Sequence, residues 1–130
     1  MTAEILVGTC NWADHKEFYP PELERGRRQR EKLDYYARYF PMVEIDTSFY
    51  GIPKPEVVDG WIGRTPPAFR FNIKAYRSLT RHERENGRPR PPTEEEVRDF
   101  LAALAPLRGF GRPEQLREGT LTHACAFSCH

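Results

Sequence analysis

Two carboxylates of this 130-residue chain, Glu44 and Asp46, stand two positions apart in a stretch that reads as a β-strand, residues 42–48. Side chains two positions apart point to the same face of a strand, so both acids should share one side of a sheet. Lys74 lies on the polar face of another predicted strand, residues 68–76. Carboxylates act as acid/base groups or bind divalent cations, and an ammonium group stabilises negative charge. Glu44, Asp46 and Lys74 are therefore the candidate catalytic residues; the alternative is an internal ion pair or polar network without chemistry.

Aromatic, hydroxyl and basic side chains follow the ends of the predicted strands. Aromatic rings at these positions could stack on a sugar or a base, although at least half of them are expected to pack in loops. Arginine and histidine side chains could contact an anionic ligand. The candidate ligand-binding residues are Trp12, Ser48, Tyr50, Arg77, Arg81 and His82.

Other reactive side chains carry weaker signals. Cys10 could be a nucleophile, but no histidine or helix N-terminus can be placed beside it. Four potential metal ligands near the end of the sequence lack the two separated pairs of a structural zinc site, so no metal site is predicted. They are His123, Cys125, Cys129 and His130. The phosphate-binding fingerprints GxGxxG and GxxxxGK(S/T) are absent from the sequence, and the cofactor is left unknown.

Composition bounds the class of protein. With 38% hydrophobic and 30% charged residues, and no apolar run of about 18 residues, the chain is expected to be a soluble domain without a membrane span. The sequence does not open on a signal-peptide pattern, and its three widely spaced cysteines do not suit a disulfide framework, so a cytoplasmic setting is expected. The net charge of +1 gives no argument for nucleic acid.

Basic residues nevertheless gather in two predicted loops. Both clusters are interpreted as solvated surface, with binding of anions or nucleic acid as the alternative. The first comprises Arg25, Arg27, Arg28, Arg30 and Lys32, and the second comprises Arg77, Arg81, Arg84, Arg88 and Arg90.

The elements that must position these side chains alternate between strands and helices. No regular element is expected in residues 11–30 or after residue 108. Thr93 and Glu96 have the spacing of a capping box, which predicts the start of the last helix. The alternating order implies parallel strands, joined by right-handed crossovers and neighbouring each other in chain order. Strands are predicted over residues 4–10, 42–48 and 68–76, and helices over residues 31–40, over residues 55–64 and from Thr93 onward.

The second and third predicted strands each have one apolar face. In an open doubly wound sheet, helices would cover both faces, and both faces would be apolar. A TIM-type (β/α)8 barrel fits better, because its helices lie outside and the other face of each strand points to the interior. The three helices are therefore expected on one side of the sheet and the polar side chains on the other. The apolar face carries Val43, Ile45, Phe69, Phe71 and Ile73.

Several segments, taken together, resemble the YecE-like family, also called domain of unknown function 72. The segments are VGTCNW…FYP, LDYYARYFPMVEIDTSFYGIP, TPPAFRFNIKAYRSLTRHER and FLAALAPL, and they cover residues 5–107 in order. The resemblance implies an α/β fold of the TIM-barrel type and no assigned reaction. The chain departs from the family pattern at Cys10, Asn11, Asp46 and Arg81.

The resemblance also bears on the extent of the fold. Family members are about twice as long as this chain, in line with the roughly 250 residues of a full barrel. The expectation is an incomplete N-terminal half barrel with about three strands and three helices in residues 4–108. Residues 109–130 are expected to be a non-matching, disordered tail of a truncated or frame-shifted chain.

Three functions are compatible with these features. The first is a barrel enzyme that acts on an anionic or nucleotide-like ligand, by hydrolysis for instance, with DNA-repair-like chemistry as a variant by analogy of fold. The second is a non-catalytic module that binds nucleic acid or anions through its arginine-rich loops. The third is a fragment without function, because three strands cannot close a barrel.

Overall fold

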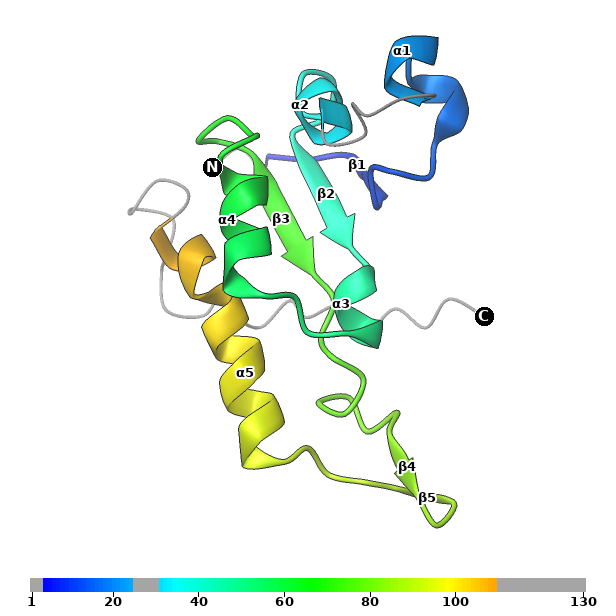
Figure 1. Cartoon of the computed structure of the whole chain (residues 1–130), viewed down its shortest axis with the longest axis vertical. Helices are drawn as coiled ribbons and strands as arrows, with labels where there is room; N and C mark the ends of the chain where they lie inside the picture. Colours follow the sequence, from blue (N-terminus) through cyan, green and yellow to red (C-terminus); the bar gives the residue numbers. More distant parts are fainter. Residues whose placement is uncertain (1–3, 25–30, 110–130) are drawn as a thin grey trace.

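Three parallel strands form the centre of the structure, which Figure 1 shows as a ribbon. The computed structural model of the chain describes residues 4–24 and 31–109. The predicted α/β class and the parallel strands in chain order are confirmed. The strands are β1 at Gly8–Cys10, β2 at Met42–Ile45 and β3 at Arg70–Ile73, in the order β1-β2-β3.

Short helices and one hairpin connect and follow these strands. The helices are α1 at Pro21–Glu24, α2 at Lys32–Tyr36, α3 at Thr47–Tyr50, α4 at Pro55–Ile62 and α5 at Glu94–Leu104, with 3-10 turns at Lys16–Phe18 and Ala105–Gly109. The hairpin pairs β4, Arg84–Glu85, with β5, Arg88–Pro89. It extends from the end of the molecule opposite α1 (Figure 1). Within the described ranges, no helix has the length and apolarity that a membrane span requires.

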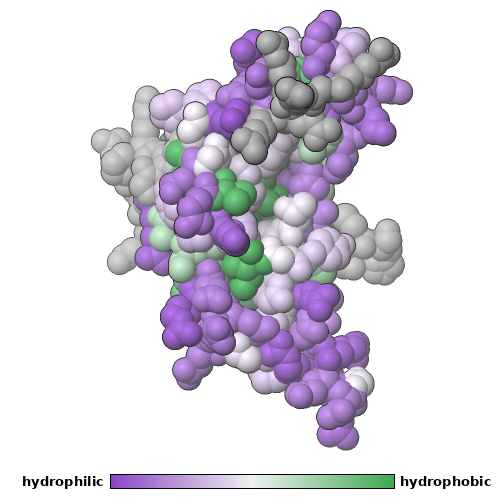
Figure 2. Space-filling view, in the orientation of Figure 1, coloured by the Kyte–Doolittle hydropathy of each residue, from purple (hydrophilic) through white to green (hydrophobic). Residues whose placement is uncertain are grey.

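The sheet packs its apolar face against α2 and α4. Val43 and Ile45 of β2 are buried together with Leu33 and Tyr36 of α2. On the same face, the Trp61 ring of α4 stacks on Phe71 of β3 with ring centroids 6.2 Å apart. Both helices therefore lie on the side that the alternating pattern predicted, and α5 packs beside α4. In Figure 2, apolar side chains gather around α4 at the middle of the visible face, between hydrophilic ends.

Tyr36 is buried completely, yet its hydroxyl belongs to the sheet rather than to the apolar core. The hydroxyl oxygen accepts hydrogen bonds from the Thr9 backbone N–H at 2.7 Å and from the Thr9 hydroxyl at 2.9 Å. It donates to the Met42 carbonyl at 3.0 Å. One side chain of α2 thus ties β1 to β2 and satisfies polar groups that would otherwise be buried without partners.

The predicted strand 42–48 is wrong in its second half. β2 ends at Ile45, and the chain turns into α3, because Asp46 has right-handed helical dihedrals of φ −81° and ψ −33°. The buried Ser48 hydroxyl lies 2.8 Å from the Ile45 carbonyl and 2.5 Å from the Lys74 carbonyl, which holds this turn against the end of β3. The alternating pattern predicted that Ser48 shares a strand face with Glu44. Because the strand ends at Ile45, it does not.

Two connections contain structure that the sequence pattern did not predict. In residues 11–30, α1 begins at Pro21, a position where proline fits because the first turn of a helix needs no N–H partner. Before α5, the β4–β5 hairpin turns at Asn86 and Gly87, whose φ angles are 51° and 77°. A two-residue hairpin turn of this kind requires left-handed backbone at both positions, which asparagine and glycine adopt most readily.

The helix predictions hold with shorter bounds. The helix expected over 31–40 spans only Lys32–Tyr36, and the chain continues in turns up to Pro41. The capping box of α5 is confirmed: the Thr93 side chain accepts from the Glu96 N–H, and the Glu96 side chain accepts from the Thr93 N–H. The tail beyond Gly109 lies outside the described residues.

Candidate functional site

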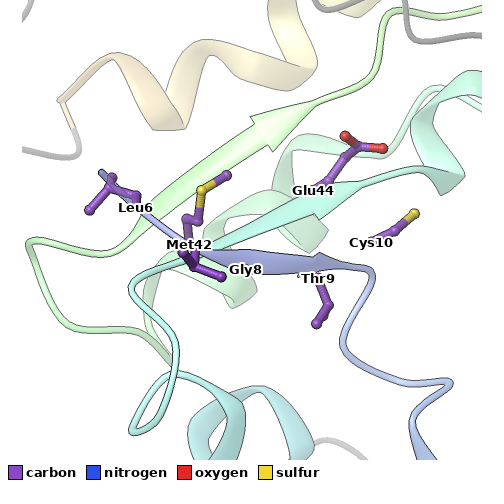
Figure 3. Close-up of a pocket in the computed structure, with 7 residues that line it drawn as sticks. Leu6, Gly8, Thr9, Cys10, Met42 and Glu44 are labelled. Atoms are coloured by element: carbon purple, nitrogen blue, oxygen red, sulfur yellow. The ribbon is translucent and has the colours of Figure 1, made fainter. Parts of the chain in front are cut away.

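The face of the sheet opposite α2 and α4 carries the polar side chains. In the register of the sheet, Cys10 lies beside Glu44 and Glu44 beside Asn72, so all three occupy this face. Figure 3 shows Glu44 rising from this face of the strands and Thr9 pointing the opposite way. An open cavity of about 320 Å³ lies along β1 and the start of β2. Its lining residues are Leu6, Val7, Gly8, Thr9, Cys10, Met42 and Glu44.

The carboxyl ends of the three strands are tied together by polar contacts. Directly after β1, the Asn11 side-chain oxygen accepts a hydrogen bond from the Asp46 N–H at 3.4 Å. The Asp46 carboxylate in turn lies 3.5 Å from the Lys74 ammonium group, directly after β3. The predicted proximity of Asp46 and Lys74 is confirmed. Their side chains are 28% and 25% exposed, so the pair is partly desolvated but open to a ligand.

Lys74 is also positioned by an aromatic ring. Its ammonium nitrogen lies 5.0 Å from the centre of the Phe49 ring, within the range of a cation–π contact. The same Phe49 ring meets the His82 imidazole edge-on, with centroids 5.3 Å apart. The His82 Nδ1 atom lies 2.7 Å from the Thr80 hydroxyl, which orients the imidazole. An acid, an amine and an imidazole therefore gather around Phe49 at one end of the sheet.

Glu44 forms no ion pair within the described residues, although its charge suggested one. It lies beside Cys10 in the register of β1 and β2. Burial, followed by the negative charges of Asp46 and Glu44, raises the pKa of Cys10 to about 11. The thiol is therefore protonated at neutral pH, which argues against Cys10 as a nucleophile.

The remaining predicted ligand-binding residues lie in three environments. Trp12 packs edge-on against Trp61, with centroids 5.8 Å apart, at the side of the core. Ser48 is buried and holds the turn described above. Tyr50 is 68% exposed. Arg77 forms an ion pair with Glu83 at 2.5 Å.

Arg81 is the last of the predicted ligand-binding residues. It is exposed and has a left-handed backbone with φ 60°. Asn11 and Thr80 were missed, because neither residue type is by itself a signal of a site. Asn11 has a left-handed backbone with φ 55°, a conformation that asparagine tolerates better than most residues.

The interpretation of the first basic cluster as solvated surface is wrong for Lys32, which is buried. Its side chain is only 5% exposed, and its ammonium group lies 2.7 Å from the Glu24 carboxylate and 3.2 Å from the Ala13 carbonyl. The other members of that cluster, residues 25–30, lie outside the described residues, as do the potential metal ligands of the tail. In the part of the chain that the structure describes, no group of three or more potential metal ligands converges.

Comparisons with known proteins place the chain among relatives. The family model described as "Protein of unknown function DUF72" matches residues 6–116. The UPF0759 protein YunF of Bacillus subtilis (strain 168) is 39% identical over 80 residues, which are 62% of this chain and 27% of YunF. The UPF0759 protein YecE of Escherichia coli (strain K12) is 35% identical over 108 residues, which are 79% of this chain and 33% of YecE.

A crystal structure gives a similar result. A DUF72 family protein from Enterococcus faecalis V583 superposes with a TM-score of 0.61 at 30% identity, covering 80% of this chain and 35% of that chain. The chain thus spans 27% to 33% of the length of these curated relatives.

Proposed function

Since this chain belongs to the DUF72 family of proteins of unknown function, we propose its role from its geometry: Asp46, Lys74 and His82 form one wall of a binding site for a small anionic or nucleotide-like ligand. The observation that carries this proposal is the placement of the Lys74 ammonium group 3.5 Å from Asp46 and 5.0 Å from the Phe49 ring, which also contacts His82.

The position of the wall supports a ligand site. In α/β folds with parallel strands, ligands bind at the carboxyl ends of the strands, where loops from neighbouring strands converge. Asn11, Asp46 and Lys74 each follow a different strand and lie at that end. We propose further that the sheet is part of a TIM-type (β/α)8 barrel, with α2 and α4 outside and Glu44 inside. The support is the one-sided packing of the helices and the polar opposite face.

The chemistry of the pair divides into two roles. At 3.5 Å the Asp46–Lys74 contact is looser than a charge-assisted hydrogen bond, which is about 2.8 Å long, so the ammonium group keeps donors for an incoming anion. Asp46 is the acid/base group of the proposal: in a hydrolysis it would accept the proton of the attacking water while Lys74 stabilises the charge on the leaving oxygen. Glu44, on the face of β2 opposite the helices, adds a second carboxylate.

The test separates binding from chemistry. Adenosine 5′-monophosphate and inorganic phosphate are titrated into the wild-type chain, Lys74→Met, Asp46→Asn and the control Lys16→Met, which removes an exposed lysine of the 3-10 turn Lys16–Phe18, outside the proposed wall. Lys74→Met should weaken anion binding about tenfold or more, and Asp46→Asn should tighten it, because a nearby negative charge is removed. Asp46→Asn should also abolish any release of phosphate from the nucleotide. Equal affinities of Lys74→Met and Lys16→Met would rule the site out.

A further inference from the structure

The loop between β3 and α5 contains two kinds of arginine. Arg77 and Arg90 are engaged: Arg77 pairs with Glu83 at 2.5 Å, and Arg90 pairs with Glu96 at 2.6 Å through two parallel hydrogen bonds. The Arg90 N–H also donates to the Glu83 carbonyl at 2.8 Å, which closes the base of the loop. These two arginines hold the loop in place and have little capacity left for a ligand.

The remaining arginines are different: Arg84 and Arg88 lie at the hairpin tip, beyond the closed base, and Arg81 lies just before that base. Arg81, Arg84 and Arg88 are exposed, and no carboxylate of the described residues lies within ion-pair distance of them. Arg84 donates one hydrogen bond to the Gly87 carbonyl at 3.1 Å, which steadies the hairpin. Glu85 stands opposite Arg88 in the hairpin register without forming an ion pair. The tip therefore carries an excess of uncompensated positive charge, and Figure 2 shows this end as predominantly hydrophilic.

The backbone conformation at Arg81 is unfavourable for an arginine. Its φ of 60° lies in the left-handed region, where a glycine or asparagine is energetically better than an arginine. Hydrogen bonds from the Arg81 N–H to the Ser78 carbonyl at 3.1 Å and from the His82 N–H to the Arg77 carbonyl at 2.8 Å impose this conformation, and Ser78 is fully buried. The loop thus presents a guanidinium group outward at a cost in stability.

An exposed aromatic ring lies next to this loop. Tyr50, at the end of α3, is 68% exposed and contacts the Phe49 ring edge-on at 5.1 Å. Phe49 contacts His82, the neighbour of Arg81, and its carbonyl accepts a hydrogen bond from the Arg77 N–H at 3.1 Å. Tyr50 is therefore linked through Phe49 to His82 and the start of the loop, and Figure 1 shows α3 next to this part of the loop, with the hairpin farther along it.

We propose that Tyr50, Arg81, Arg84 and Arg88 form a binding surface for single-stranded nucleic acid. Guanidinium groups bind phosphates through paired hydrogen bonds, and an exposed aromatic ring stacks on an unpaired base, a combination typical of single-strand binding. A free phosphate would not use the tyrosine, and an acidic peptide offers no planar base to stack on it. The surface contains neither Asp46 nor Lys74, so it stands whether or not that pair binds a small anion.

The test measures binding of a fluorescein-labelled oligothymidylate by anisotropy at several salt concentrations. The double variant Arg84→Gln/Arg88→Gln should weaken binding at least about tenfold and lower the slope of log affinity against log salt by about 1.4, the value for two phosphate contacts on a single strand. The control Arg98→Gln, an exposed arginine on α5, should change neither quantity. Equal effects of the two variants would overturn the proposal.

Three further variants make the outcome independent of folding. Arg81→Gly should weaken binding while the unfolding midpoint stays the same or rises, because glycine suits the left-handed backbone. Tyr50→Ala should weaken binding more than Tyr39→Ala, which removes another exposed tyrosine, 61% exposed, in the turn after α2. Binding that competes equally with polyglutamate, or that ignores Tyr50, would refute the surface.

Discussion

A side chain at Gly8 would collide with the backbone of Met42. A Cβ atom at Gly8 would lie 2.8 Å from the Met42 carbonyl carbon and closer still to its oxygen, nearer than real Cβ contacts come. Gly8→Ala should therefore lower the free energy of unfolding by about 2 kcal/mol or more, because β1 must move away from β2 and its ladder must distort. Urea unfolding of the two proteins measures this difference, and an unchanged midpoint would show that β1 does not sit this closely against β2.

Gly60 is the opposite case. It is exposed inside α4, and a Cβ atom there meets nothing within 4 Å. Gly60→Ala should raise the free energy of unfolding by about 0.5–1 kcal/mol, because alanine loses less conformational entropy in a helix than glycine does. The same urea titration checks the sign; destabilisation would mean that α4 is not a regular helix at this position.

The Tyr36 hydroxyl should contribute to stability beyond the packing of its ring. Tyr36→Phe removes the shared partner of the Thr9 N–H and the Met42 carbonyl, and should cost about 1–3 kcal/mol. The control is Tyr35→Phe in the same helix. The Tyr35 hydroxyl interacts with Tyr39 instead of the strands, and this interaction raises the pKa of Tyr35. Thermal unfolding should separate the two variants clearly. Equal midpoints would mean that water replaces the hydroxyl at no cost.

The buried Lys32–Glu24 pair should show strong coupling. Lys32→Met leaves the Glu24 carboxylate, which is 23% exposed, without its partner and should cost about 3 kcal/mol. The double variant Lys32→Met/Glu24→Leu should cost less than Lys32→Met alone, since no uncompensated charge remains. Chemical denaturation of the four proteins completes the cycle. Additive effects would show that the two groups do not interact across their 2.7 Å contact.

Protonation of Glu96 should lower the free energy of unfolding in acid. The hydrogen bonds from Arg90, and then from the Thr93 N–H, lower the pKa of Glu96 from its ordinary value of 4.5 to about 2. A carboxyl group with a lower pKa in the folded state contributes its stability above the unfolded value. That contribution is lost as the pH falls from about 4.5 through about 2.

Urea midpoints measured between about pH 6 and about pH 2.5 should therefore fall less steeply for Glu96→Gln than for the wild type. Glu94→Gln, in the same first turn of α5, serves as the control and should follow the wild-type profile. Parallel profiles of the wild type and Glu96→Gln would show that the Arg90 contact does not persist in solution.

Local signals in the sequence predicted the parts of the fold that local physics determines. Alternation at Val43 and Ile45 identified the buried face of β2, and the spacing of Thr93 and Glu96 identified the start of α5. The proximity of Asp46 and Lys74 followed from the order of parallel strands alone. Each of these features depends on neighbours in the chain or on one general rule of topology.

The errors arose where residues distant in the sequence determine the local conformation or the burial of a side chain. Ser48 continues the alternating pattern, but a carbonyl 26 positions away, at Lys74, holds it in a helical turn. Lys32 resembles a surface lysine, and only its contact with Glu24 makes it a buried one. The orienting role of Phe49 for both Lys74 and His82 depends on how the loop folds back, which no spacing along the chain records.

The closed base of the arginine loop has a consequence for how this protein can vary. Arg77 with Glu83 on one side, and Arg90 with Glu96 on the other, anchor the loop to itself and to α5, and the Arg90–Glu83 backbone bond joins the two sides. The two ends of the segment between Glu83 and Arg90 are therefore fixed independently of its length and sequence. Insertions, deletions or grafted recognition sequences in this segment should leave the strands undisturbed. This is the position at which the binding specificity of the protein can change most easily, by evolution or by design.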